Sequence, residues 1–138
     1  MVIMKKKILI AAGGTGGHIF PGVAIASEFM GRGDYTPIFA GTRRGLEEKI
    51  IGTMGWQLYF VSASAIKGKS AWQRLLSLFR LPLAMVEALR IITLTNPALV
   101  VSIGGYAAGP LAIMAWIMRI PMVIVEPNAI PGLSNRIL

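Results

Sequence analysis

Cysteine is absent from the 138-residue sequence, and histidine occurs once, as His18. Without cysteine the chain can form neither a disulfide framework nor a thiolate metal site, and nothing in it requires an oxidising compartment. Long apolar runs are also lacking, since the run Leu111–Met118 ends at Arg119 and is far shorter than the roughly 20 residues needed to cross a bilayer. The sequence therefore excludes a disulfide-stapled domain and predicts a protein that does not span a membrane.

Acidic residues are scarce as well. Six aspartates and glutamates stand against 14 lysines and arginines, which gives a formal net charge of +8. Such a charge favours phosphate groups, anionic lipid surfaces or nucleic acid as partners. Nucleic acid is the least favoured of the three, because the aromatic residues are not interleaved with basic ones along an identifiable groove. Hydrophobic residues make up 54% of the chain, which is enough for the core of one domain.

Short apolar segments of strand length alternate with longer segments of helical spacing. The strands are expected at Ile8–Ala12, Thr36–Ala40, Leu58–Val61, Leu99–Ile103 and Met122–Val125. The helices are expected at Pro21–Met30, Leu46–Met54, Ala71–Thr95 and Pro110–Met118. Pro21 and Pro110 suit first-turn positions, whereas Pro82 should kink or divide the third helix. Strands that are apolar at successive positions should be buried on both faces. The pattern predicts an α/β fold with a Rossmann-like parallel sheet and helices on both faces.

Three unusual segments follow the first, fourth and fifth expected strands. They are Gly13-Gly14-Thr15-Gly16-Gly17-His18, Gly104-Gly105-Tyr106-Ala107-Ala108-Gly109-Pro110 and Glu126-Pro127-Asn128-Ala129. Ligands of open parallel sheets bind beyond the carboxyl ends of the strands, so these segments should gather on one rim. Two glycine clusters that each lead into a helix favour a diphosphate ligand over simple tight turns. A dinucleotide fingerprint does not fit, since Ile19 stands where a glycine is required, and neither does a P-loop.

His18 lies where the first glycine cluster enters a helix. The start of a helix disfavours the charged imidazolium form, so we expect a neutral imidazole that can act as a general base. Glu126 and Asn128 could hold sugar hydroxyls or a nucleotide, or could simply form a turn, and spacing alone favours neither interpretation. Glu47 and Glu48 open an expected helix, where acids suit the helix dipole, and we expect both on a solvated face.

The segment from Lys67 to Arg80 combines an apolar stripe with basic residues. The stripe consists of Trp72, Leu75, Leu76 and Phe79, and the basic residues are Lys67, Lys69, Arg74 and Arg80. Such a stripe most often faces a core, yet Leu78, Leu81 and Leu83 widen it beyond what one sheet contact needs. We therefore expect a patch that attaches reversibly to an anionic membrane surface.

The glycine clusters and the segments after them resemble the MurG family of glycosyltransferases. The matching stretches are Gly13–Gly22, Gly41-Thr42, Gly104–Tyr106 with Gly109-Pro110, and Asn128–Leu133. The resemblance implies a GT-B fold of two Rossmann-like domains. Residues 1–138 would be the amino-terminal, acceptor-binding domain, and the carboxy-terminal domain that binds UDP-N-acetylglucosamine would be absent.

The reaction implied by the resemblance is the inverting transfer of N-acetylglucosamine from UDP-N-acetylglucosamine to the muramyl 4-hydroxyl of an undecaprenyl-diphosphate-linked acceptor. This step converts lipid I to lipid II in peptidoglycan synthesis. It implies a peripheral protein on the cytoplasmic face of the bacterial cell membrane, with other cell-wall synthesis proteins as candidate partners. Neither a tightly bound cofactor nor a divalent metal ion is implied.

The same resemblance assigns roles to individual residues. His18 would deprotonate the acceptor hydroxyl. The donor would be contacted by Thr15, Gly16, Gly17 and Asn128. The acceptor diphosphate would lie near Gly13, Gly14, Gly104, Gly105 and Tyr106. Val125 and Pro127 depart from the family's His-Glu-Gln-Asn stretch, while Glu126 and Asn128 keep it.

Two other functions stay open from the sequence. The chain could be a membrane-docking subunit that completes its cleft with a separate donor-binding chain. It could also be a non-catalytic domain that binds anionic lipid. A further helix is expected to start after residues 128–132, so we expect the chain to be half of a larger unit and inactive alone.

Overall fold

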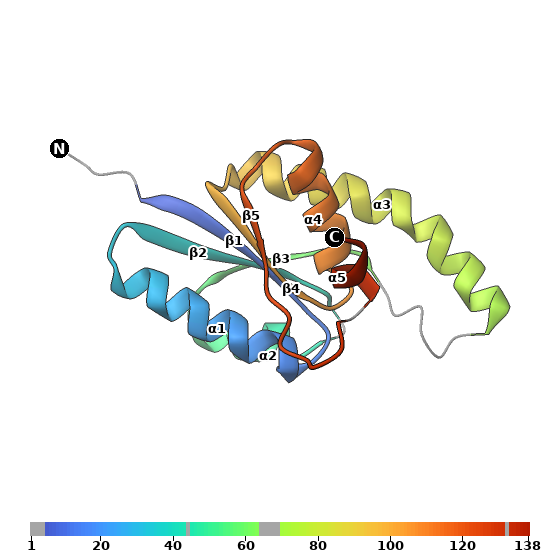
Figure 1. Ribbon diagram of the computed structural model, residues 1–138, viewed down its shortest axis with the longest axis horizontal. Coiled ribbons are helices and arrows are strands. Elements are labelled where there is room, and N and C mark those ends of the chain that lie inside the picture. The colour runs from blue at the N-terminus through green and yellow to red at the C-terminus, as the bar shows by residue number, and fades with distance from the viewer. Residues whose placement is uncertain (1–4, 44, 64–69, 132) are drawn as a thin grey trace.

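The computed structural model describes residues 5–43, 45–63, 70–131 and 133–138. Five parallel strands form one sheet in the order β3-β2-β1-β4-β5 (Figure 1). The strands are β1 (Lys6–Ala12), β2 (Tyr35–Gly41), β3 (Gln57–Phe60), β4 (Leu99–Gly104) and β5 (Met122–Ile124). The helices are α1 (Gly16–Gly31), α2 (Glu47–Thr53), α3 (Ala71–Thr95), α4 (Ala108–Ile117) and α5 (Leu133–Ile137). The predicted Rossmann-like parallel sheet is confirmed.

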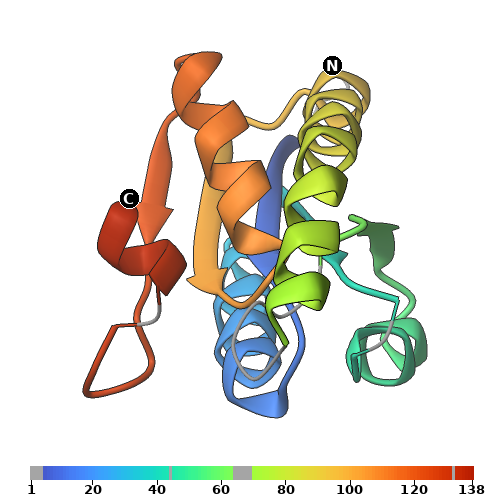
Figure 2. The ribbon, with the colours of Figure 1, turned by 90° about the vertical axis from the view of Figure 1, so that its right-hand side faces the viewer.

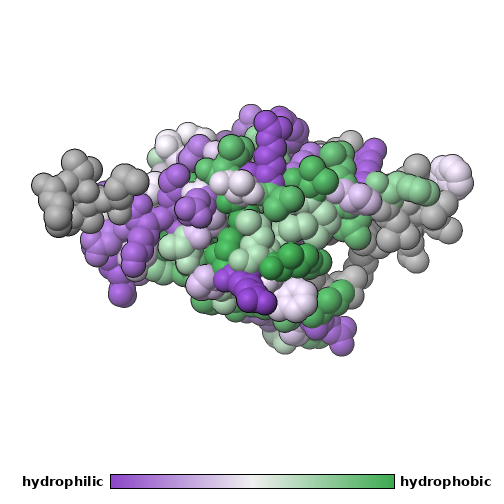
Figure 3. Space-filling model, turned by 90° about the horizontal axis from the view of Figure 1, so that it is seen from above, coloured by the Kyte–Doolittle hydropathy of each residue, from purple (hydrophilic) through white to green (hydrophobic). Residues whose placement is uncertain are grey.

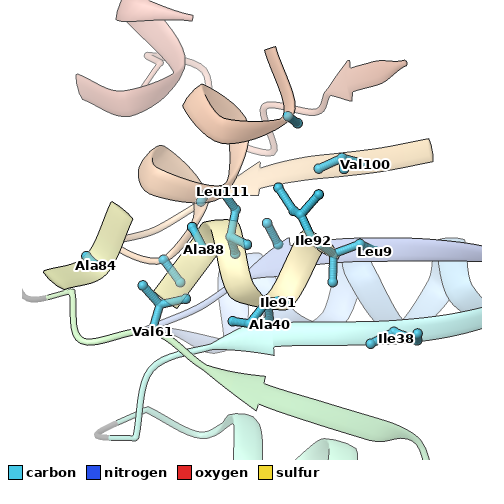
Figure 4. Packing of buried hydrophobic residues seen from close by; sticks show 14 residues of the cluster. Leu9, Ile38, Ala40, Val61, Ala84, Ala88, Ile91, Ile92, Val100 and Leu111 are labelled. Carbon is cyan, nitrogen blue, oxygen red and sulfur yellow. The ribbon is translucent and has the colours of Figure 1, made fainter. Parts of the chain in front are cut away.

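Helices cover both faces of this sheet (Figure 2). On one face α1 and α2 contribute Ile19 and Ile51 to a buried cluster with Ile10 of β1. On the other face Leu9 of β1 packs in a second cluster with residues of α3 and α4 (Figure 4). Neighbouring residues of a strand point to opposite faces, so β1 needs an apolar residue at each of these positions. The successive apolar residues of β1 therefore report burial on both sides, as predicted.

The outer strand β5 departs from the predicted burial. Val123 and Ile124 are exposed, although their apolar run predicted a strand covered on both faces. Within the described chain β5 pairs only with β4, and it lies at the edge of the sheet. The apolar run therefore identified the strand correctly but gave the wrong burial, because an edge strand has fewer neighbours to cover it.

The prolines behave differently in three helices. Pro110 lies in the first turn of α4, as predicted. The prediction for Pro21 is wrong, because α1 begins earlier, at Gly16, and places Pro21 inside the helix. Thr15 precedes this start with an extended backbone, and its carbonyl accepts the N–H groups of the third and fourth helical residues. Helix α3 continues through Pro82 over its whole predicted range and is not divided there.

Candidate functional site

The carboxyl ends of β1 and β4 bring the two glycine loops together, as predicted. A Cβ atom added to Gly105 would lie 2.0 Å from the carbonyl oxygen of Gly13, so the two loops touch through their backbones. Gly105 also has a φ of 87°, which L side chains rarely adopt. Gly14 has a φ of 94°, and the ring of Tyr106 lies 3.4 Å from the place of its missing Cβ. The second loop thus forms a wall directly behind the first.

His18 lies in the first turn of α1, half-buried beside both loops. Its Nδ1 atom is 3.0 Å from the hydroxyl oxygen of Thr15. On the other side of the ring, a Cβ atom on Gly104 would lie 3.0 Å from Cδ2 and 3.1 Å from Nε2. When Nδ1–H donates to Thr15, Nε2 carries the lone pair and can accept a proton. The Thr15 contact thus holds the Nδ1 side of the ring, and Nε2 lies on the side that faces Gly104.

The start of α1 also offers backbone hydrogen-bond donors. The N–H of Gly14 is bound by the side chain of Glu47. The N–H groups of Gly16 and Gly17 have no acceptor in the part of the chain that the structure describes. Free N–H groups at a helix start carry a partial positive charge, which favours an anionic ligand. Gly16 and Gly17 are thus better placed than Gly14 to donate to a phosphate.

The predicted exposure of Glu47 is wrong, whereas that of Glu48 is correct. The Glu47 side chain is only 1% exposed. Its Oε1 atom accepts hydrogen bonds from Gly14 N at 2.8 Å, Thr42 N at 2.9 Å and Thr42 Oγ1 at 3.1 Å. The helix-dipole argument treats the two neighbouring acids alike and cannot tell which one turns inward. Sequence reasoning therefore missed a carboxylate that joins the loops after β1 and β2.

A third group of polar side chains surrounds Glu126, after β5. Asn128 donates to Glu126 Oε1 through its backbone N at 2.9 Å and its Nδ2 at 3.0 Å. Asn135 of α5 donates through Nδ2 to Glu126 Oε2 at 3.0 Å and to the carbonyl oxygen of Val125 at 3.3 Å. The turn that the sequence left open is therefore present. It holds the Glu126 carboxylate between two asparagines.

Asn135 links this group to the neighbourhood of His18. Its Nδ2 atom lies 3.6 Å from the place of the missing Gly104 Cβ, the same point that approaches the His18 ring. The buried Oδ1 atom of Asn135 has no hydrogen-bond partner in the described chain. Sequence reasoning missed this residue, because only the fold brings α5 beside the second glycine loop.

Contacts with donor and acceptor molecules stay predictions for the glycine-loop residues and for Asn128. Among the described residues, the hydrogen bonds of Asn128 go to Glu126, and none joins it to Thr15, Gly16 or Gly17.

No three histidine, aspartate or glutamate side chains of the described chain are arranged to hold a metal ion.

The predicted membrane patch is described in part. Lys67 and Lys69 lie outside the described residues, as do the side chains of Arg74, Leu75 and Leu76. Trp72 and Phe79 are 68% and 74% exposed, and Arg80 is exposed beside them. Figure 3 shows hydrophobic residues over much of the side on which α3 and α4 lie. None of the described helices has the length and apolarity needed to cross a membrane.

Trp116 of α4 adds to the exposed apolar surface and was missed by the sequence analysis. Its side chain is 72% exposed, and that of the next residue, Ile117, is exposed as well. Both residues belong to an apolar run that reads as a buried helix, so periodicity gave no sign of their exposure. The neighbouring helices α3 and α4 therefore both present large apolar side chains to solvent.

The sheet with its two glycine loops defines the amino-terminal domain of a GT-B glycosyltransferase. The crystal structure of Acinetobacter baumannii MurG is similar, with a TM-score of 0.82 and 29% identity, over 95% of this chain and 38% of that protein. The calicheamicin glycosyltransferase CalG4 has a TM-score of 0.64 at 18% identity, over 94% of this chain and 34% of that one, and shows the fold alone.

The chain belongs to glycosyltransferase family 28, whose N-terminal domain model matches residues 8–138. It is 46% identical over 133 residues to the UDP-N-acetylglucosamine--N-acetylmuramyl-(pentapeptide) pyrophosphoryl-undecaprenol N-acetylglucosamine transferase of Myxococcus xanthus. It is 43% identical over 136 residues to the transferase of the same name from Syntrophus aciditrophicus. These matches cover 96% and 98% of this chain but only 35% and 38% of those relatives. The predicted resemblance to the MurG family is confirmed.

Proposed function

We propose that this chain is the acceptor-binding part of an enzyme that makes lipid II. The enzyme transfers N-acetylglucosamine from UDP-N-acetylglucosamine to the muramyl 4-hydroxyl of lipid I, the undecaprenyl-diphosphate-linked acceptor. The observation that carries this proposal is the placement of His18, which Thr15 holds at 3.0 Å beside two touching glycine loops. The relatives named for this reaction support it, because their similarity to the chain includes these loops.

In the proposed reaction His18 acts as the general base. Its Nε2 atom accepts the proton of the 4-hydroxyl while the hydroxyl oxygen forms a bond to the anomeric carbon of the donor. The bond from that carbon to UDP breaks with its electron pair on the diphosphate oxygen, and the anomeric configuration inverts. Thr15 keeps the imidazole oriented so that Nε2, rather than Nδ1, faces the acceptor.

Binding of the two substrates is divided among the loops. We assign the donor contacts to Thr15, Gly16, Gly17 and Asn128. The acceptor diphosphate is assigned to the neighbourhood of Gly13, Gly14, Gly104, Gly105 and Tyr106. The N–H of Gly14 is occupied by Glu47, so this residue lines the site without donating to the ligand.

A chimeric enzyme tests this function. Residues 1–138 would replace the matching segment of the Myxococcus xanthus relative, and lipid II formation would be measured from lipid I and labelled UDP-N-acetylglucosamine. We expect transfer by the chimera and none by the chain alone or by the remainder of the relative alone. A folded chimera that makes no lipid II contradicts the proposal. Transfer by the chain alone would show that it needs no donor-binding domain.

We further propose that the α3 side docks the protein on the anionic cytoplasmic face of the membrane. Trp72 and Phe79 expose apolar rings, and Arg80 adds a positive charge beside them. Apolar burial and attraction to anionic lipid add together in such peripheral binding, and salt weakens the second contribution. The exposed aromatic rings, rather than the net charge alone, favour a lipid surface over nucleic acid.

Vesicle flotation separates this docking from non-specific attraction. The chain should float with vesicles that contain phosphatidylglycerol, less with phosphatidylcholine alone, and less at high salt. The double variant Trp72→Ser, Phe79→Ser should lose most of this binding. Leu94→Ser is the matched control, because Leu94 is 61% exposed at the other end of α3. Equal flotation of both variants would show that Trp72 and Phe79 do not form the membrane-binding patch.

A further inference from the structure

We propose that Glu47 is a positioning residue for the catalytic loop: it fixes the Gly13–His18 segment through the N–H of Gly14. Glu47 touches no substrate in this proposal and acts through the backbone that leads to Thr15 and His18. The kinetic part of the test rests on the proposed transferase function. A second measurement, on the only histidine of the chain, does not depend on that function.

The first observation is the concentration of hydrogen bonds on one oxygen atom. Glu47 Oε1 accepts two backbone N–H groups and one hydroxyl, from Gly14 and Thr42. The bonds to Thr42 are local, because they close the turn that leads into α2. The bond to Gly14 spans 33 positions in the sequence and reaches the loop that carries His18. A carboxylate that served only α2 would have no need of this second loop.

The second observation is the space that glycines leave for this side chain. Cβ atoms added to Gly13, Gly41 and Gly45 would lie 2.7, 2.6 and 1.6 Å from the nearest atoms of the Glu47 side chain. None of these three glycines has a positive φ. Their backbone conformations do not require glycine, but the space for the Glu47 side chain does. Three glycines, one after β1, one at the end of β2 and one in the loop after it, therefore accommodate one buried carboxylate.

The third observation concerns the other carboxylate oxygen. Oε2 is buried and has no hydrogen-bond partner in the described chain. The fixed atom is thus Oε1, and its role is to accept hydrogen bonds at a fixed distance from α2. If position is what matters, an amide oxygen of the same reach can replace Oε1, and a shorter carboxylate cannot.

Three substitutions of Glu47 separate reach from charge. Glu47→Gln keeps the reach and loses the charge, Glu47→Asp keeps the charge and loses one methylene, and Glu47→Ala loses both. In the chimera we expect Glu47→Gln to stay within about 3-fold of the parent kcat. Glu47→Asp and Glu47→Ala should lower kcat about 100-fold, because a displacement of about 1 Å at a catalytic group has effects of that size. Glu48→Gln, on the exposed neighbour, is the matched control and should change nothing.

The His18 side-chain signal in the NMR spectrum of the chain reports the same displacement without any substrate. The Cε1–H signal of this single histidine should keep its chemical shift in Glu47→Gln and Glu48→Gln, and should move in Glu47→Asp and Glu47→Ala. Parent-like kcat and an unmoved signal in folded Glu47→Ala and Glu47→Asp would overturn the proposal. So would an active Asp variant beside an inactive Gln variant, since charge rather than reach would then matter. If the signal moves while no chimera transfers sugar, the proposed function fails and the positioning role stands.

Gly45→Ala provides an independent approach that leaves Glu47 in place. Its Cβ would lie 1.6 Å from Glu47 Oε2 and must push the carboxylate aside. We expect a kcat as low as that of Glu47→Ala, and a double variant within about 3-fold of either single one, because the clash needs the carboxylate. Independent, multiplying effects of the two substitutions would show that Gly45 does not act through Glu47.

Discussion

The two glycine loops follow neighbouring strands and look alike in the sequence, but they contribute differently to the site. The loop after β1 is tied to polar side chains, since Gly14 donates to Glu47 and Thr15 contacts His18. The loop after β4 contributes mainly the absence of side chains at Gly104 and Gly105, both with positive φ. The first loop presents His18, the proposed general base, and the second leaves room for its ring. Glycine clusters of similar composition therefore need not have similar roles.

The largest expected effect is a loss of folding stability when a residue of the second loop, at its contact with the first loop, is changed. Gly105→Ala should destabilise the chain by about 2 to 6 kcal/mol, as left-handed backbone strain and a forced contact each cost about 1 to 3 kcal/mol. The forced contact is with the Gly13 carbonyl oxygen, 2.0 Å from the new Cβ. Urea unfolding measures the change. Gly31→Ala is the control, since its Cβ meets no atom within 4 Å. A Gly105→Ala chain as stable as this control would disprove the backbone contact between the loops.

The next effect concerns His18, the proposed general base of the first loop. His18→Ala should lower kcat of the chimera by about 10² to 10⁴-fold, the usual contribution of a general base. Stability should change little, because His18 is half-buried and its side-chain hydrogen bond is to the exposed Thr15. Steady-state kinetics measure the loss of kcat, and a thermal unfolding curve of the same sample shows whether stability has changed. Near-parent turnover would assign the proton transfer to another group.

Sequence reasoning found the elements whose signals are local, although it placed the start of α1 too late and expected Pro82 to interrupt α3. Helix α3 has its predicted bounds, and all five strands were found, because apolar runs and turn residues fix such elements locally. The meeting of the two glycine loops beside His18 was also predicted, since the carboxyl ends of parallel strands must share one rim, whereas the catalytic role of His18 stays a prediction. The exposed state of β5 was missed because exposure depends on which strands lie beside it.

The missed site residues share one physical cause. Glu47 binds Gly14 across 33 positions, and Asn135 binds Glu126 across 9. Neither pairing follows from helical or strand periodicity, because each joins a helix residue to a loop that only the folded chain brings beside it. A glycine such as Gly45, which is needed only because a side chain would clash with Glu47, cannot be distinguished in the sequence from a glycine that forms a turn. Such residues become visible only after the loops are placed together.

A smaller effect should separate the orienting role of Thr15 from its predicted donor contact. Thr15→Val removes the hydroxyl that lies 3.0 Å from His18 Nδ1, whereas Thr15→Ser keeps it. A net hydrogen bond of about 0.5 to 1.5 kcal/mol corresponds to roughly a 2- to 10-fold lower kcat for the valine variant. The serine variant should match the parent. A raised KM for UDP-N-acetylglucosamine in the valine variant would show that the Thr15 hydroxyl also contacts the donor. An unchanged kcat would show that this hydroxyl does not orient His18.

The smallest expected effect tests whether the second loop also supplies chemistry through Tyr106. Its ring packs 3.4 Å from the place of the missing Gly14 Cβ, and no described residue hydrogen-bonds its hydroxyl. If the ring only supports the first loop, Tyr106→Phe should change kcat and the acceptor KM by less than about 3-fold, because a wall residue needs only its shape. Tyr106→Ala, which removes the ring, should have the larger effect on both constants. A strong loss in Tyr106→Phe would instead mean that the hydroxyl binds the acceptor. The second loop would then take part in recognition, and the contrast between the two loops would be one of degree.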